Sequence, residues 1–117
     1  MLIREKNNKE ITLGVYTYCI YNYVMLYEWD ENKNKNNFVK HGLDFQDAIL
    51  VFDSPMLIAQ DLRNDYGEIR LSGIGLIRNY FVVVIYTENE EKDTRRIISF
   101  RKATRSEREF YESYFQY

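Results

Sequence analysis

The chain has 117 residues, of which 45% are apolar and 29% are charged, and its formal net charge is −2. This composition predicts one globular domain with its own hydrophobic core and excludes a wholly disordered chain. The single cysteine, Cys19, excludes an intrachain disulfide and favours the cytoplasm, and the single histidine, His41, argues against a zinc site built from His and Cys.

The first part of the chain contains an uncharged, tyrosine-rich stretch at 11–27, ITLGVYTYCIYNYVMLY. It is shorter than the roughly 20 residues that a membrane-spanning helix needs, and its tyrosines and threonines are polar. We therefore expect no membrane span. Regular patterning begins only at Met25, so we divide the chain into an N-terminal extension at 1–24 and a folded domain at 25–117.

Two short helices are predicted after the extension. Asp30 can cap the first, which runs through ENKNKNNFVK and ends at His41-Gly42, where cations are favourable at the negative end of the helix dipole. The second begins after Asp44 and ends at 53–55, Asp-Ser-Pro. Its apolar residues recur at helical spacing and predict one buried stripe: Phe45, Ala48, Ile49 and Phe52.

Four strand-like runs follow: MLIAQ at 56–60, EIRLSGIGLI at 68–77, YFVVVIYT at 80–87 and TRRIISFRKA at 94–103. Arg78-Asn79 predicts a tight hairpin, and the acidic segment 88–93 predicts a turn before the last run. Short links between consecutive strands predict an antiparallel meander. Gly73 and Gly75 within a strand indicate a bulge or close packing.

A last helix is predicted from the capping-box pattern Thr104-x-x-Glu107. An aromatic stripe at helical spacing follows it: Phe110, Tyr111, Tyr114 and Phe115. The predicted fold class is therefore α+β, with two N-terminal helices and one C-terminal helix packed on a curved antiparallel sheet of about four strands.

Positive charge is concentrated in one segment. Residues 94–108 hold six cations and one acid, a net of +5, so the remainder of the chain carries −7. A local basic patch is the usual footprint of a nucleic-acid binder. Strict alternation along the last strand places Arg101 on one face with Ile97 and Ser99, and Arg96 on the other face with Ile98 and Phe100. Either arginine could pair with a carboxylate that only stabilises the fold, or could meet an anionic ligand.

Several other charged residues have two possible roles. His41 could be a cap cation at the end of the first helix, or a general acid or base near neutral pH. Glu68 and Arg70 lie two apart in a predicted strand and share a face, which suits a salt bridge or an acid beside a phosphate-binding arginine. Arg105 and Arg108 are expected on the exposed side of the last helix. The sequence contains no phosphate loop, nucleophile elbow or paired metal-binding histidines.

The ordered motifs of this chain resemble those of the BrnT toxins of bacterial type II toxin–antitoxin systems. They are YEWDENKNKNNFVKHG at 27–42, FQDAILVFD at 45–53, Asp61, GEIR at 67–70, Gly75, VVVIYT at 82–87 and RIISFRKATRSERE at 96–109 leading to Tyr111. The resemblance implies a small ribonuclease with a fold like that of the RelE toxins, which arrests growth by cutting RNA. It also implies a BrnA antitoxin with a ribbon-helix-helix DNA-binding part, through which the complex represses its own operon.

The chain departs from the family pattern at two positions. Phe100 replaces the alanine of the usual RIISARKA, and Asn64 stands where the family commonly has a histidine before GE-x-R. A chain that lacks this imidazole must use His41 or work without one. The resemblance also suggests that a BrnT toxin would begin near Met25, so we favour an upstream start codon chosen in error as the origin of residues 1–24. Mass spectrometry of the natural N-terminus tests this.

RNA cleavage without a metal requires a proton acceptor for the 2′-hydroxyl, charge stabilisation at phosphorus and a proton for the leaving oxygen. Arginine suits the second task because its fork matches phosphate oxygens. The catalytic candidates are His41, Arg101, Arg96, Glu68 and Glu107. The substrate-binding candidates are Lys40, Arg70, Lys33 and Lys102, and neither a metal nor a cofactor is expected. The alternatives are a catalytically degenerate RNA- or partner-binding module and an interaction protein whose basic edge binds an acidic partner.

Overall fold

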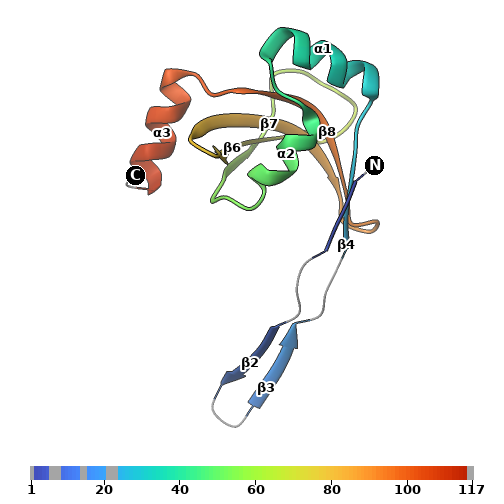
Figure 1. The fold of residues 1–117 in the computed structure, drawn as a ribbon, viewed down its shortest axis with the longest axis vertical. Coiled ribbons are helices and arrows are strands. Elements are labelled where there is room, and N and C mark those ends of the chain that lie inside the picture. Colours follow the sequence, from blue (N-terminus) through green and yellow to red (C-terminus); the bar gives the residue numbers. More distant parts are fainter. Residues whose placement is uncertain (1, 6–8, 14–15, 21–23, 116–117) are drawn as a thin grey trace.

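The computed structural model describes residues 2–5, 9–13, 16–20 and 24–115, with side chains from Met25 onward. The elements run in the order β1 (Leu2–Glu5), β2 (Lys9–Leu13), β3 (Tyr16–Ile20), β4 (Val24–Glu28), α1 (Glu31–His41), α2 (Phe45–Val51), β5 (Leu57–Gln60), β6 (Leu71–Ile77), β7 (Tyr80–Asn89), β8 (Thr94–Lys102) and α3 (Arg105–Phe115). Figure 1 shows the helices around a curved sheet, with the β2–β3 hairpin set apart from it. The α+β class is confirmed.

The main sheet has six strands in the order β1-β4-β8-β7-β6-β5. The predicted meander is present, because β5, β6, β7 and β8 pair antiparallel with their neighbours. The prediction of a purely antiparallel sheet of about four strands is wrong. β4 pairs parallel with β8, and β1 pairs antiparallel with β4 at the edge. Strand β4 was not predicted because residues 24–27 lie within the uncharged tyrosine-rich stretch and have no turn signal of their own.

The described part of the stretch at 11–27 forms strands, and residues 14–15 and 21–23 lie outside the described residues. None of the helices within the described ranges is long and apolar enough to cross a membrane. The division at residue 24 stays a prediction, while the pairing of β1 with β4 joins residues 2–5 to the sheet.

Both N-terminal helices begin where their capping residues predict and α1 also ends there, whereas α2 ends at Val51, before the predicted stop at 53–55. The Asp30 carboxylate accepts from the N–H groups of Asn32 and Lys33, and Gly42 closes α1 at φ 71°. Asp44 caps α2 through the N–H of Gln46. Of the predicted α2 stripe, Phe45, Ala48 and Ile49 are buried, whereas Phe52 is the partly buried C-cap.

The core lies between α2 and one face of the sheet, which we call the core face; it carries Val82, Val84, Tyr86, Ile97 and Phe100. The predicted close packing at the strand glycines is confirmed. A β-carbon on Gly75 would lie 2.7 Å from Val51 Cγ1, and one on Gly73 would clash with Met56 Cε. Glycine at these positions therefore lets α2 and the segment after it lie directly on β6.

The predicted capping box of α3 is present. The Thr104 N–H donates to Glu107 Oε1 at 2.8 Å, and the Glu107 N–H donates to Thr104 Oγ1 at 3.2 Å. The aromatic stripe is only half buried. Tyr111 is fully buried, and its hydroxyl donates to the Pro55 carbonyl, whereas Phe110 and Tyr114 are exposed.

Candidate functional site

One extra residue in β8 decides where its arginines point. In the pairing of β8 with β7, Ile85 is opposite Ser99, but the next residue, Tyr86, is opposite Ile97. Ile98 is therefore the additional residue of a β-bulge. Ile97 and Phe100 are both buried on the core face although they are three apart. The prediction that Arg96 and Arg101 lie on opposite faces is therefore wrong, because the bulge reverses the alternation between them.

Arg96 and Arg101 share the face opposite the core face. Arg101 pairs with Val83 and Arg96 with Thr87 across the β7–β8 ladder, and Ser99 lies between them opposite Ile85. We call this surface the arginine face. Four residues of strand lie between the two arginines, which places their backbones about 13–17 Å apart at the rise of a β-strand. Groups that far apart suit different phosphates of an extended strand better than one shared phosphate.

Arg101 is held by a bidentate ion pair. Its Nη1 and Nη2 donate to the two carboxylate oxygens of Glu107 at 2.7 and 2.9 Å. The guanidinium of Arg101 and the N–H of Thr104 lower the pKa of Glu107 to about 2, against the opposing effect of burial. Glu107 is therefore a carboxylate at neutral pH that orients Arg101, and its low basicity makes it a weak proton acceptor.

Arg96 belongs to a second cluster on the same face. Its Nη2 donates to Glu68 Oε1 at 2.5 Å, and Arg70 Nε donates to the same oxygen at 3.2 Å. The Arg70 guanidinium lies 3.9 Å from the centre of the Tyr66 ring. Glu68 and Arg70 do pair, but the predicted strand at 68–77 begins only at Leu71, so they lie on an irregular segment that reaches β8.

The irregular segment is pinned by an ion pair at its start. Asp61, which is buried, accepts from Arg63 Nε at 2.8 Å and from Nη2 at 2.9 Å, and it accepts from the Tyr66 hydroxyl at 3.3 Å. These bonds lower the pKa of Asp61 to about 2. Asn64, in the position of the family's histidine, donates to the Tyr66 hydroxyl at 3.1 Å. A cavity joins this segment to the arginine face and is lined by Asp61, Arg63, Ile85, Arg101 and Glu107, among others.

Helix α1 flanks the arginine face along the edge of β8. The amide of buried Asn37 accepts from the Phe100 N–H at 3.2 Å and donates to the Phe100 carbonyl at 2.8 Å, as a neighbouring strand would. It also donates to the Leu43 carbonyl at 3.0 Å. We call these hydrogen bonds of Asn37 the amide clamp; they hold β8 at Phe100, two residues beyond Ile98 and next to Arg101. Sequence reasoning missed Asn37, and its only signal was a polar residue on the inner side of a helix with few apolar residues.

His41 lies at the end of α1 near this edge. A shallow cavity is lined by His41 and Lys40 together with Lys33, Ile98 and Ser99, among others. Burial lowers the pKa of His41 below its ordinary value, and the charges of Lys40 and Arg101 lower it further. His41 is therefore neutral at neutral pH, with a ring nitrogen that can accept a proton.

The structure brings most of the candidate residues together and separates one. The arginine face holds two clusters, Arg101 with Glu107 and Arg96 with Glu68 and Arg70. A cavity at its α1 edge is lined by His41, Lys40 and Lys33. Lys102 lies on the opposite side of β8, opposite Val82, with its ammonium 5.2 Å from the Tyr80 ring centre. Arg95 is also on the core face, where it donates to Glu88 and to the Tyr27 hydroxyl and stabilises the fold.

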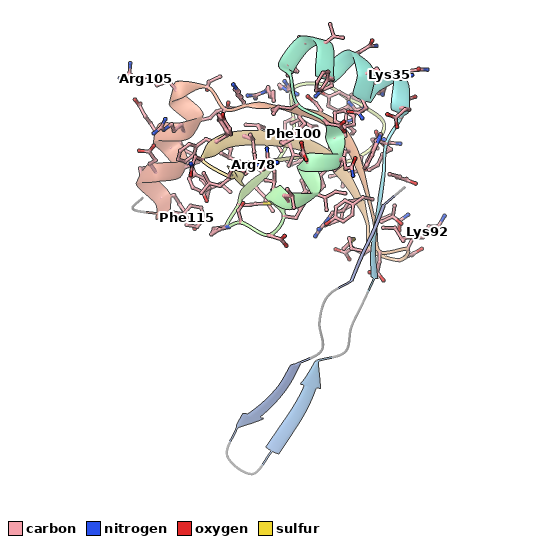
Figure 2. All side chains as sticks on the ribbon, viewed as in Figure 1. Lys35, Arg78, Lys92, Phe100, Arg105 and Phe115 are labelled. Atoms are coloured by element: carbon pink, nitrogen blue, oxygen red, sulfur yellow. The ribbon has the colours of Figure 1, made fainter. Side chains whose placement is uncertain are left out.

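Arg105 and Arg108 form i,i+4 ion pairs with Glu109 and Glu112 along α3. Figure 2 shows Arg105 projecting from the start of this helix and Lys35 projecting from α1. Among the described side chains, no three His, Cys, Asp or Glu residues converge as metal ligands. The arginines and lysines of this arrangement can bind anions, and His41 can accept a proton.

Comparison with known proteins identifies the family. A family model described as "Ribonuclease toxin, BrnT, of type II toxin-antitoxin system" matches residues 29–107, which is more than half of the chain and spans α1 through β8 to Glu107. No curated protein matches the chain. The chain belongs to the BrnT family of ribonuclease toxins of type II toxin–antitoxin systems.

Proposed function

We propose that the protein is a cytoplasmic, metal-independent endoribonuclease that inhibits growth by cutting RNA. The observation that carries this proposal is the bulge at Ile98, which turns Arg96 and Arg101 to the same face. Each guanidinium is oriented by a carboxylate before any substrate arrives. Pre-oriented donors cost no reorganisation when negative charge develops on a phosphate.

In this proposal Arg101 binds the scissile phosphate. A guanidinium has five N–H donors, and three hydrogen bonds hold Arg101 to Glu107 and to the Lys102 carbonyl. The remaining capacity suits the equatorial oxygens of the phosphorane. Arg96 and Arg70 bind a neighbouring phosphate, and Lys40 adds positive charge at the same edge.

His41 takes the proton from the 2′-hydroxyl in the proposed reaction. Its lowered pKa keeps the imidazole neutral at the pH of the cytoplasm, and Arg101 acts on its electrostatics from the arginine face. The 2′-oxygen then attacks phosphorus and the bond to the 5′-oxygen breaks as that oxygen takes a proton from solvent water, to which His41 later returns the proton that it accepted. The products carry a 2′,3′-cyclic phosphate and a 5′-hydroxyl. Glu107 acts by holding Arg101, and Glu68 by holding Arg96 and Arg70.

The family implies a protein antitoxin. We propose a BrnA-like ribbon-helix-helix protein, with operator DNA bound only through this partner. We also propose that the domain resembles the RelE toxins, a likeness supported by the consecutive meander β5–β8, which α1 and α2 precede and α3 follows.

Expression in a host that lacks the neighbouring gene tests the function. We expect growth arrest with cleaved RNA, rescue by the neighbouring gene product, and loss of both effects in Arg101→Ala. Arg105→Ala is the matched control, because Arg105 is exposed and pairs only along its own helix. Intact RNA without arrest would contradict the proposal. RNA binding without cleavage would identify the degenerate binding module instead.

A further inference from the structure

A cavity of about 350 Å³ lies beside the arginine face, between the end of β4, the start of α1 and β8. Its lining comprises Glu28, Trp29, Asp30, Lys33, Arg96, Ile97 and Ile98. Lys33 and Ile98 also line the cavity that holds His41, so the two hollows adjoin along α1. The volume lies within the range of small-ligand sites, about 300–1,000 Å³.

We propose that this cavity is a nucleotide subsite, in which the base of a single-stranded RNA stacks on Trp29 while Lys33 and Arg96 hold its phosphate. The inference rests on the proposed function and extends it from one cleavage centre to a strand of several nucleotides.

Trp29 is fixed before any ligand binds. Its indole N–H donates to Glu31 at 3.1 Å, and its ring meets Phe45 edge to face with the centroids 6.4 Å apart. The ring is partly buried against the core and still lines the cavity. An aromatic ring in a fixed orientation loses little entropy on stacking, and every base offers a π-face to it.

The lining of the cavity carries charges of both signs. Lys33 and Arg96 supply cations, as a phosphate requires. Glu28 and Asp30 supply carboxylates, and Asp30 already caps α1. Carboxylates repel a second phosphate but accept hydrogen bonds from base N–H groups. One nucleotide, with its phosphate on Lys33 and Arg96 and its base edge on a carboxylate, matches this lining.

Single strands are favoured over duplexes. The bases of a duplex are stacked on their neighbours, and sequence-specific RNA readers bind unpaired bases that can leave the stack. The ladder spacing separates Arg96 from Arg101, so a strand bound at both arginines extends beyond the scissile bond.

Trp29 is the only tryptophan of the chain, so its fluorescence reports on the subsite directly. We would titrate the full-length protein with a single-stranded 2′-O-methyl RNA octamer, which cannot be cleaved by attack of a 2′-hydroxyl. We expect saturable quenching by the single strand and much weaker quenching by the same sequence in a duplex. Lys33→Ala should weaken binding at least about fivefold, since it removes a phosphate contact. Lys35→Ala, on the outer side of the same helix, should change it less than twofold.

Trp29→Ala should weaken octamer binding by about 5- to 100-fold, as loss of one stacked base does. Trp29→Phe keeps a ring against Phe45 and should recover most of the binding, measured by anisotropy of a labelled strand.

If anisotropy shows that the octamer binds while the fluorescence of Trp29 does not change, the proposed subsite is wrong. Equal effects of Lys33→Ala and Lys35→Ala on octamer binding would also overturn it. So would Trp29 fluorescence that is quenched by the antitoxin and not by the octamer. Cleavage is assayed separately on unmodified RNA. A protein that quenches but does not cut would contradict the proposed nuclease and leave the subsite standing.

Discussion

Glu107 serves two elements with one carboxylate. It caps α3 through the Thr104 N–H and holds the Arg101 guanidinium in a bidentate pair. A single substitution at this residue therefore changes both the stability of the fold and the orientation of the candidate catalytic arginine.

Glu107→Gln should lower the free energy of unfolding at pH 7 by about 1–3 kcal/mol, allowing for partial exposure of the pair. The folded pKa of about 2 lies below the ordinary value of 4.5. The stabilisation by Glu107 is therefore present above pH 4.5 and is lost as the pH falls toward 2. Urea denaturation across this range should show the wild type and the variant converging near pH 2. Glu109→Gln, on the exposed side of α3, is the control, and an unchanged difference at pH 7 and pH 2 would refute the assignment.

His41 can be followed without ambiguity because it is the only histidine. NMR titration of its ring proton should give a pKa below the ordinary value of about 6.5. Lys40→Ala should raise this pKa, because a nearby cation disfavours the imidazolium, and Lys35→Ala should not. With His41 as the base, kcat/KM should rise with pH through the same pKa and level off by neutral pH. A pKa above 6.5 would argue against this role.

At the scale of elements, helix ends were predictable because their signals are local. Asp30, Gly42 and Asp44 act within one turn of where they stand in the sequence. The bulge at Ile98 was not predictable, since one extra residue in a strand leaves no mark in an apolar run. It reversed the relative orientation of Arg96 and Arg101. The strand start at Leu71 was also missed, because 68–70 alternates like a strand while Arg70 stacks on Tyr66.

The element that fixes β8 beside the bulge is α1, through Asn37. Asn37→Ala should destabilise the fold by about 2–4 kcal/mol, because the Phe100 N–H and two carbonyls lose their partner in a buried place. Denaturant unfolding measures this. Asn36→Ala is the matched control, since Asn36 is the exposed neighbour on the same helix. Equal stabilities of the two variants would show that the amide clamp contributes nothing.

Over the whole molecule, the cations of the basic segment at 94–108 have different roles. Arg95 and Lys102 lie on the core face, Arg105 and Arg108 pair along α3, and Arg96 and Arg101 lie on the arginine face. The acidic remainder of the chain is compatible with RNA binding, because a local anion site needs positive charge at the site alone.

The logarithm of the association constant for single-stranded RNA should fall linearly with the logarithm of the salt concentration. Each phosphate contact should contribute about −0.7 to the slope. Arg96→Ala and Arg101→Ala should each reduce the slope by about this amount. Arg105→Ala should leave it unchanged, because this side chain is exposed and paired with Glu109. Fluorescence anisotropy between low and moderate salt measures the slope, and an equal loss in all three variants would indicate nonspecific attraction.

The most direct test is the chemistry of the cut ends. Purified protein should cleave single-stranded RNA in the presence of a chelator and leave a 2′,3′-cyclic phosphate and a 5′-hydroxyl, as mass spectrometry of the fragments would show. Arg101→Ala should reduce the rate by about 100-fold or more, as loss of a transition-state donor does, and a strand with 2′-deoxyribose at the scissile position should stay intact. Cleavage of the deoxy strand, or full activity in Arg101→Ala, would contradict the assignment of Arg101 and the 2′-hydroxyl to the reaction.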